Sequence, residues 1–75
     1  MDNIIKIINE INPYVDIDYT TQLLEEEILD SLGIMYLVAS LEDTYDIEIN
    51  GEDIIPENFQ NVNSINNLIK LARKD

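Results

Sequence analysis

The sequence predicts an all-α fold, a bundle of three main helices and one short helix around a single core. Apolar residues recur at helical spacing in three separate stretches, near the start, in the middle and at the end. Residues 46–49 alternate like a strand, but four residues cannot make a sheet alone. The chain has 75 residues, 45% of them hydrophobic, and no internal repeat or linker, so we expect one domain over residues 1–75.

The first helix is predicted close to the start of the chain, before Asn12-Pro13. Asp2 or Asn3 can cap its N-terminus. Asn12 should end it, because the residue before Pro13 is pushed out of the helical region. Its apolar face is formed by Ile4, Ile7, Ile8 and Ile11. We expect this face to pack on the core.

Residues 14–27 have no sustained periodicity and predict a long ordered loop. The side chains expected to pin it are Val15, Ile17, Tyr19, Leu23 and Leu24. Long loops are uncommon in compact domains and often functional. The run Glu25-Glu26-Glu27 is interpreted as a solvated face rather than a set of ligands.

The second helix should begin after Asp30, a good N-cap residue, with Ser31 in its first turn. One apolar stripe along it comprises Ile34, Leu37, Val38, Leu41 and Tyr45. A second stripe comprises Leu32, Met35 and Ala39. The core needs one stripe, so the second is either buried in a central helix or left free as a docking surface.

A short helix and a last helix complete the predicted bundle. Asn50-Gly51 predicts a turn, and Pro56 can open the short helix, which Phe59 would anchor. Asn63 or Ser64 should cap the last helix. Its apolar residues are Ile65, Leu68, Ile69 and Ala72, and the cations Lys70, Arg73 and Lys74 suit the dipole at its end.

Composition excludes several classes of function. Sixteen acidic against four basic residues give a net charge of -12, which would repel nucleic acid; the charge serves either solubility or partners with basic patches. Without Cys or His, the chain lacks a thiolate site and the usual general base. No apolar run approaches a membrane span, and the N-terminus lacks the features of a signal peptide. We expect a cytoplasmic monomer.

Ser31 is the first candidate for chemistry. Hydrolysis is a poor prospect, because the chain offers no suitable base beside it and no Gly-x-Ser-x-Gly elbow. A hydroxyl in the first turn of a helix does suit attachment of a phosphate, since free N–H groups and the helix dipole favour an anion there. Phosphorylation alone would fit this physics, and a serine without further function would also occupy the position.

A calcium-binding module is the alternative function. The residues that fit calcium-loop spacing are Asp46, Glu48, Asn50, Gly51 and Glu57. Asp16, Asp18, Thr20 and Glu27 repeat the end-to-end spacing without the glycine. The two loops would leave too few residues for the helices between them. Asp53 also occupies a normally apolar position, and Pro56 would interrupt the exiting helix.

Several motifs resemble one known family. One part of the chain resembles the second helix and following loop of acyl carrier proteins, through Asp30-Ser31-Leu32, Leu37-Val38, Leu41-Glu42 and the run from Tyr45 to Ile49. The likeness continues through the segment from Pro56 to Phe59 and through Val62 and Ile65. The resemblance implies an all-α, four-helix acyl-carrier-like bundle with three main helices, a short third helix and a long first loop. It also implies that the protein is not itself an enzyme.

The resemblance further implies that Ser31, flanked by Asp30 and Leu32, carries a 4′-phosphopantetheine arm. A phosphopantetheinyl transferase would install the arm from coenzyme A with Mg²⁺. The arm's thiol would hold an acyl, aminoacyl or polyketide unit as a thioester. Loading and synthase enzymes with basic patches would be the other partners. The residues expected to face partners are Leu32, Met35, Tyr36, Ala39 and Glu42.

The chain departs from the pattern of bacterial fatty-acid carriers at three positions. Gly33 and Tyr36 stand where acids are usual, and Leu29 where glycine or alanine is common. Acidic residues lie instead at Glu25–Glu27, Glu42 and Asp43. The Leu-Asp-Ser-Leu-Gly pattern looks more like stand-alone D-alanyl carriers or peptidyl and polyketide carriers, which favours a dedicated pathway over housekeeping fatty-acid synthesis.

Overall fold

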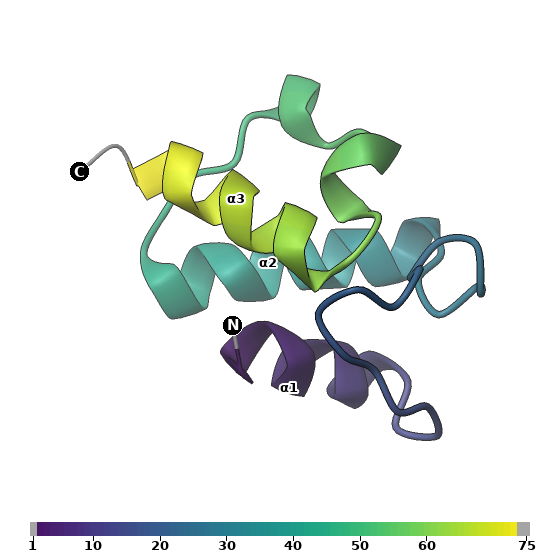
Figure 1. The fold of residues 1–75 in the computed structure, drawn as a ribbon. Helices are drawn as coiled ribbons and strands as arrows, with labels where there is room; N and C mark the ends of the chain where they lie inside the picture. The colour runs from purple at the N-terminus through teal and green to yellow at the C-terminus, as the bar shows by residue number, and fades with distance from the viewer. Residues whose placement is uncertain (1, 74–75) are drawn as a thin grey trace.

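The computed structural model describes residues 2–73 and confirms the predicted all-α fold. It contains the helices α1 (Asp2–Ile11), α2 (Ser31–Tyr45) and α3 (Val62–Arg73), and the 3₁₀ turns η1 (Gly51–Asp53) and η2 (Pro56–Phe59), as Figure 1 shows. No strand is found within residues 2–73. The alternating residues 46–49 instead form the irregular connection from α2 to η1.

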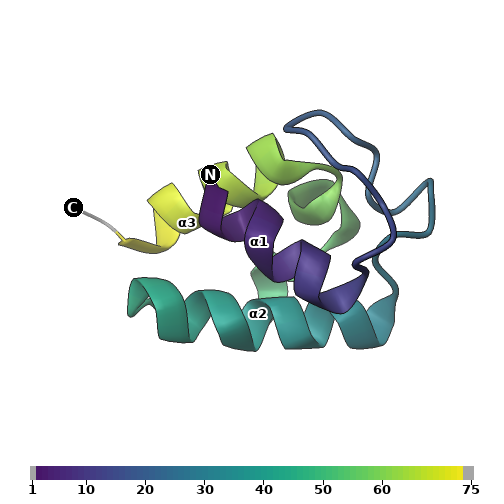
Figure 2. The ribbon, with the colours of Figure 1, turned by 90° about the horizontal axis from the view of Figure 1, so that it is seen from below.

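The three helices pack with the first loop at one end of the bundle. In both ribbon views α1 runs towards that end, whereas α2 and α3 run away from it (Figures 1 and 2). Ser31 therefore lies at the end where the loop gathers. The start of α1 and the end of α3 both lie towards the other end of the molecule (Figure 2). None of the helices within residues 2–73 is long and apolar enough to cross a membrane.

The core draws on every helix, on η2 and on the loops. Its buried side chains are Ile4, Ile7, Ile8, Leu23, Ile28, Leu29, Leu37, Val38, Leu41, Ile49, Phe59, Val62, Ile65, Leu68 and Ile69. The helical spacing predicted most of this set in α1, α2 and α3, although Ile11, Ile34, Tyr45 and Ala72 are only partly buried. No buried polar or charged residue occurs among the described residues, so the bundle is held by apolar packing.

The first loop is ordered, as predicted, and Leu23 is its main anchor. The Leu23 side chain is fully buried. Its N–H donates a hydrogen bond to the carbonyl of Gln60 (2.8 Å), and its carbonyl accepts from the N–H groups of Ile28 (2.9 Å) and Leu29 (3.1 Å). The loop is thus tied to the segment before α3 and to the residues that precede α2. Tyr19 is less buried than expected, at 40% exposed, and its carbonyl accepts a hydrogen bond from the Asn63 N–H at 3.2 Å.

Two predicted helix starts are wrong by one to three residues. The first helix already includes Asp2, so the predicted caps at residues 2 and 3 lie inside it. The last helix starts at Val62, because the Asn61 side chain accepts a hydrogen bond from the Ser64 N–H (2.8 Å) and so fills the capping role. Pro56 does open a helical turn, which is 3₁₀ rather than α. Lys74 lies outside the described residues.

Candidate functional site

The candidate site is the first turn of α2, which presents Ser31 to solvent. Asp30 is the N-cap, as predicted: its backbone is extended, and Oδ1 accepts a hydrogen bond from the Gly33 N–H at 2.8 Å. The Asp30 carbonyl accepts from the Ile34 N–H at 2.9 Å. Ser31 is the first residue inside the helix, and its side chain is exposed. Its hydroxyl is therefore open to an incoming enzyme.

Buried residues on both sides hold this turn in place. Ile28 and Leu29, which lead into it, are 7% and 3% exposed. Leu37 and Val38, further along α2, are also in the core. Since apolar anchors lie before and after Ser31, its backbone has a fixed position although its side chain is free. This arrangement suits a modification site that a separate enzyme must reach.

The second apolar stripe of α2 is exposed, together with Tyr36. Leu32 is 81% exposed, Met35 64% and Tyr36 52%, and Ala39 is also classed as exposed. The structure thus decides between the two interpretations of this stripe: the bundle does not bury it. Side chains three and four positions apart share a face of a helix, so these residues form one apolar strip beginning beside Ser31.

Glu42, predicted as a partner contact, makes a contact within the protein. It is partly buried, and its Oε2 accepts a hydrogen bond from the Ile49 N–H at 2.9 Å. Its backbone carbonyl accepts from Ile47 (3.2 Å) and from Asp46, which ends the helix in a left-handed conformation (φ 53°). Glu42 thus holds the loop after α2. No local sequence pattern predicts a contact across seven residues.

Gly33 is buried against α1, a contact that the sequence did not reveal. A Cβ at Gly33 would lie 3.3 Å from Asp30 Oδ1, 3.4 Å from Leu29 Cδ2 and 3.5 Å from Ile11 Cγ2. A side chain there would be tightest against the Asp30 cap and would touch Ile11, in the last turn of α1, at an ordinary van der Waals distance. Beside it lies an open groove of ≈ 410 Å³, lined by Glu10, Ile11, Asp30, Leu32, Gly33 and Tyr36.

Periodicity assigned Ile11 to the core, and it left Glu10 without a role. Both residues belong to the groove because the fold brings the last turn of α1 next to the first turn of α2. These two turns lie about twenty residues apart in the chain, separated by a loop without periodicity. The glycine after Leu32 is the one local signal that could have pointed to close packing there.

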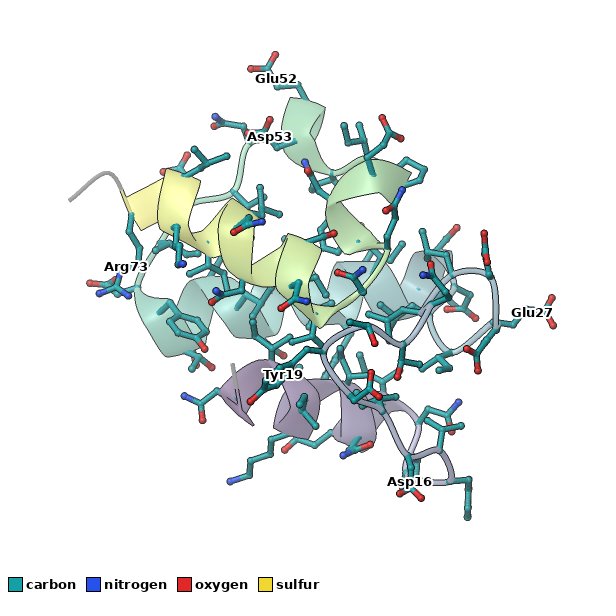
Figure 3. The ribbon with its side chains drawn as sticks, viewed as in Figure 1. Asp16, Tyr19, Glu27, Glu52, Asp53 and Arg73 are labelled. Carbon is teal, nitrogen blue, oxygen red and sulfur yellow. The ribbon has the colours of Figure 1, made fainter. Side chains whose placement is uncertain are left out.

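Acidic side chains lie at the Ser31 end of the molecule and also in η1, which carries Glu52 and Asp53. Glu25, Glu26 and Glu27 are exposed in the loop that leads to Ser31, which confirms the solvated face that was predicted. In Figure 3, Glu27 lies at the end where the first loop gathers, and Arg73 lies at the opposite side of the molecule. Lys6, Lys70 and Arg73 are the basic residues within positions 2–73. Lys70 and Arg73 both belong to the last turns of α3.

Asp18 in the first loop has a perturbed carboxyl group. The Thr20 N–H (2.8 Å), the Thr20 hydroxyl (2.9 Å) and the Thr21 hydroxyl (3.1 Å) donate hydrogen bonds to its Oδ1. These donors favour the ionised form and hold the pKa of Asp18 below its usual value, the Thr20 N–H contributing most. The contacts order the loop locally and lie within one turn of the chain.

The calcium alternative finds no support in the structure. Residues 2–73 contain no group of three or more acidic side chains placed to hold a metal ion. Asp46 serves as the C-cap of α2, and Gly51 begins the 3₁₀ turn η1. Two 3₁₀ turns follow in place of the exiting helix that a calcium loop requires.

The first turn of α2 fits a covalently bound phosphate group. Neither the Ser31 nor the Leu32 N–H makes a hydrogen bond within the described residues, so both donors face outward at the positive end of the helix dipole. The Asp30 carboxylate is already directed to Gly33 by its cap hydrogen bond. An anion on Ser31 would meet two free donors.

Comparison with known proteins agrees with this site. The family model described as "Phosphopantetheine attachment site" matches residues 2–71, nearly the whole chain. A search of curated proteins found no match, and neither did a search of solved structures. Members of the matched family are non-catalytic carriers of covalent 4′-phosphopantetheine. With its helical bundle and its exposed serine at the start of α2, the chain belongs to this family of phosphopantetheine carriers.

Proposed function

We propose that Ser31 is the attachment point of the arm and that residues 1–75 act as one monomeric carrier domain in the cytoplasm. The observation that carries the proposal is the position of Ser31: exposed, first in α2 and inside an Asp-Ser-Leu triplet whose aspartate caps the helix. Ser40 and Ser64, the other serines of the chain, are partly buried within helices.

In the proposed chemistry, a transferase forms a phosphodiester between Ser31 Oγ and the arm. The pyrophosphate bond of coenzyme A breaks, and adenosine 3′,5′-bisphosphate leaves. The transferase would take the hydroxyl proton, because this chain offers no His and no Cys. Once attached, the phosphate would lie at the N-terminus of α2, where the dipole and the free N–H groups favour its charge. The arm supplies the thiol on which cargo is held.

The exposed strip of α2 is the proposed contact surface for partner enzymes. It comprises Leu32, Met35, Tyr36 and Ala39, with Glu42 at its far end. Apolar side chains exposed next to an attachment point suit binding to a matching surface, and the acids of the first loop would complement a basic rim. Aminoacyl, peptidyl or polyketide cargo in a dedicated pathway is proposed over fatty-acid synthesis, because Gly33 and Tyr36 stand where acids are usual.

Intact mass spectrometry tests the attachment. The protein is incubated with coenzyme A, Mg²⁺ and a broad-range phosphopantetheinyl transferase. We expect the mass to increase by one phosphopantetheine group in the wild type and in the matched control Ser40→Ala, and to stay unchanged in Ser31→Ala. A wild type without adduct, or an adduct on Ser31→Ala, would show that the proposed function is wrong.

A further inference from the structure

We infer that the transferase that modifies Ser31 binds the groove between α1 and α2 with an arginine or lysine side chain. The inference rests on the proposed function and extends the contact surface from α2 to the last turn of α1. The groove has a volume of ≈ 410 Å³ and lies directly beside the attachment point. Two of its lining residues, Asp30 and Leu32, are the sequence neighbours of Ser31.

The walls of the groove suit a long cationic side chain. Ile11, Leu32 and Tyr36 provide apolar surface, and Gly33 lines the groove between them. Lysine and arginine lay their aliphatic stems along apolar surface and keep the charged head outside. An aromatic ring at the wall adds favourable interaction with the cation.

The lining of the groove carries two carboxylates, and neither forms an ion pair within residues 2–73, although Lys6 lies one turn before Glu10 in α1. Glu10 is exposed, and its carboxylate forms no hydrogen bond or ion pair with any residue from 2 to 73. Asp30 uses Oδ1 for the cap hydrogen bond, and no bond to its other oxygen is found among the same residues. Two carboxylates at the mouth of an apolar groove are complementary to a cation, which strengthens and orients the encounter.

The position of the groove explains why the transferase would cover it. An enzyme that brings coenzyme A to Ser31 Oγ must also lie against the residues on either side of Ser31. Leu32 is 81% exposed and forms both the start of the apolar strip and a wall of the groove. A surface that covers Leu32 therefore reaches the groove without further rearrangement of the carrier.

A second copy of this chain is a poor occupant. Each copy carries a net charge of -12, and its groove and first loop present the exposed acids Glu10, Asp30 and Glu25–Glu27. Two such surfaces would repel each other. The ammonium group of an aminoacyl cargo is positively charged and would also be complementary to the two carboxylates of the groove. The experiment below distinguishes binding of this cargo from binding of the transferase.

The test compares two neutral substitutions in the unmodified, cargo-free protein. Glu10→Gln removes one charge from the groove, and Glu52→Gln removes the same charge from the exposed turn η1, which does not contribute to the groove. The rate of phosphopantetheine transfer is measured at several carrier concentrations. We expect Glu10→Gln to lower kcat/KM about fivefold through KM, the size of one partly exposed charge pair. Glu52→Gln should change it less than about twofold, and Glu10→Asp should retain most of the wild-type value.

Two outcomes would overturn the inference while Ser31 is still modified. Equal kcat/KM values for Glu10→Gln and Glu52→Gln would show that the transferase does not use the groove. Unchanged transfer, with faster hydrolysis of an aminoacyl thioester on Glu10→Gln, would assign the groove to the cargo. Melting temperatures of all three variants are measured alongside, and because Glu10 and Glu52 are exposed we expect them to match the wild type. A wild type that takes no adduct would instead contradict the proposed function.

Discussion

The carboxylate of Asp30 fixes the first turn of α2 through its hydrogen bond to the Gly33 N–H at 2.8 Å. Replacing Asp30 with Ala leaves that N–H without its partner and should lower the free energy of unfolding by about 1 kcal/mol. Asp30→Asn keeps an oxygen in the same place and should be nearly neutral. Urea denaturation followed by circular dichroism measures both. Equal losses for the two variants would show that charge, rather than capping, is what Asp30 contributes.

The lowered pKa of Asp18 predicts that part of the protein's stability is lost at low pH. Its pKa is lower in the folded chain than in the unfolded chain, because Thr20 and Thr21 donate hydrogen bonds to the carboxylate. The stabilisation is therefore present at neutral pH and is lost as the pH falls through the lowered value. A carboxyl NMR titration should place Asp18 below its usual value, and Thr20→Val should raise it. Thr44→Val, on α2, should leave it unchanged, and a titration of Asp18 unaffected by Thr20→Val would contradict this account.

Leu23 shows how one side chain organises a whole element, the first loop. It is fully buried, and its backbone links Gln60 to the residues that precede α2. Leu23→Ala should cost about 2 to 5 kcal/mol, as for other large-to-small substitutions in a core. The amides of Ile28 and Leu29 should also exchange hydrogen faster. Leu24→Ala, at a partly buried neighbour, is the matched control and should have a smaller effect. Similar losses for both would mean that the loop has no single anchor.

Periodicity predicted the helices because their apolar residues face a single core. Ile4, Ile7 and Ile8 were assigned correctly on spacing alone, as were Leu37 and Leu41. The contacts that complete the site are of another kind. They depend on segments that approach one another only in the folded chain, as Ile11 approaches Gly33 and Ile49 reaches back to Glu42.

Within the candidate site, the sequence predicted the features that depend on contacts between residues close together in the chain. Asp30 was recognised as a cap because capping acts over three residues. The groove was missed because two of its six lining residues, Glu10 and Ile11, come from α1. Asn61 was missed as the cap of α3 because Asn63 and Ser64 offered equally suitable side chains, and only the path of the chain after η2 decides among them.

The charge of the whole molecule predicts sensitivity to salt. A net charge of -12 on a chain of 75 residues destabilises the compact state through self-repulsion, and salt screens that repulsion. We expect the melting temperature to rise between low and moderate NaCl concentration. Glu26→Lys, at an exposed position, should raise it at low salt and weaken its dependence on salt. A melting temperature that does not change with salt would contradict this electrostatic account.

The start of α1 and the end of α3 lie away from the end that presents Ser31. A tag, a surface or a fused protein joined at either terminus would therefore be held clear of the serine. The carrier can be immobilised through the end opposite Ser31 while enzymes approach the end that presents Ser31. This geometry makes the chain a convenient module for grafting onto beads or scaffolds.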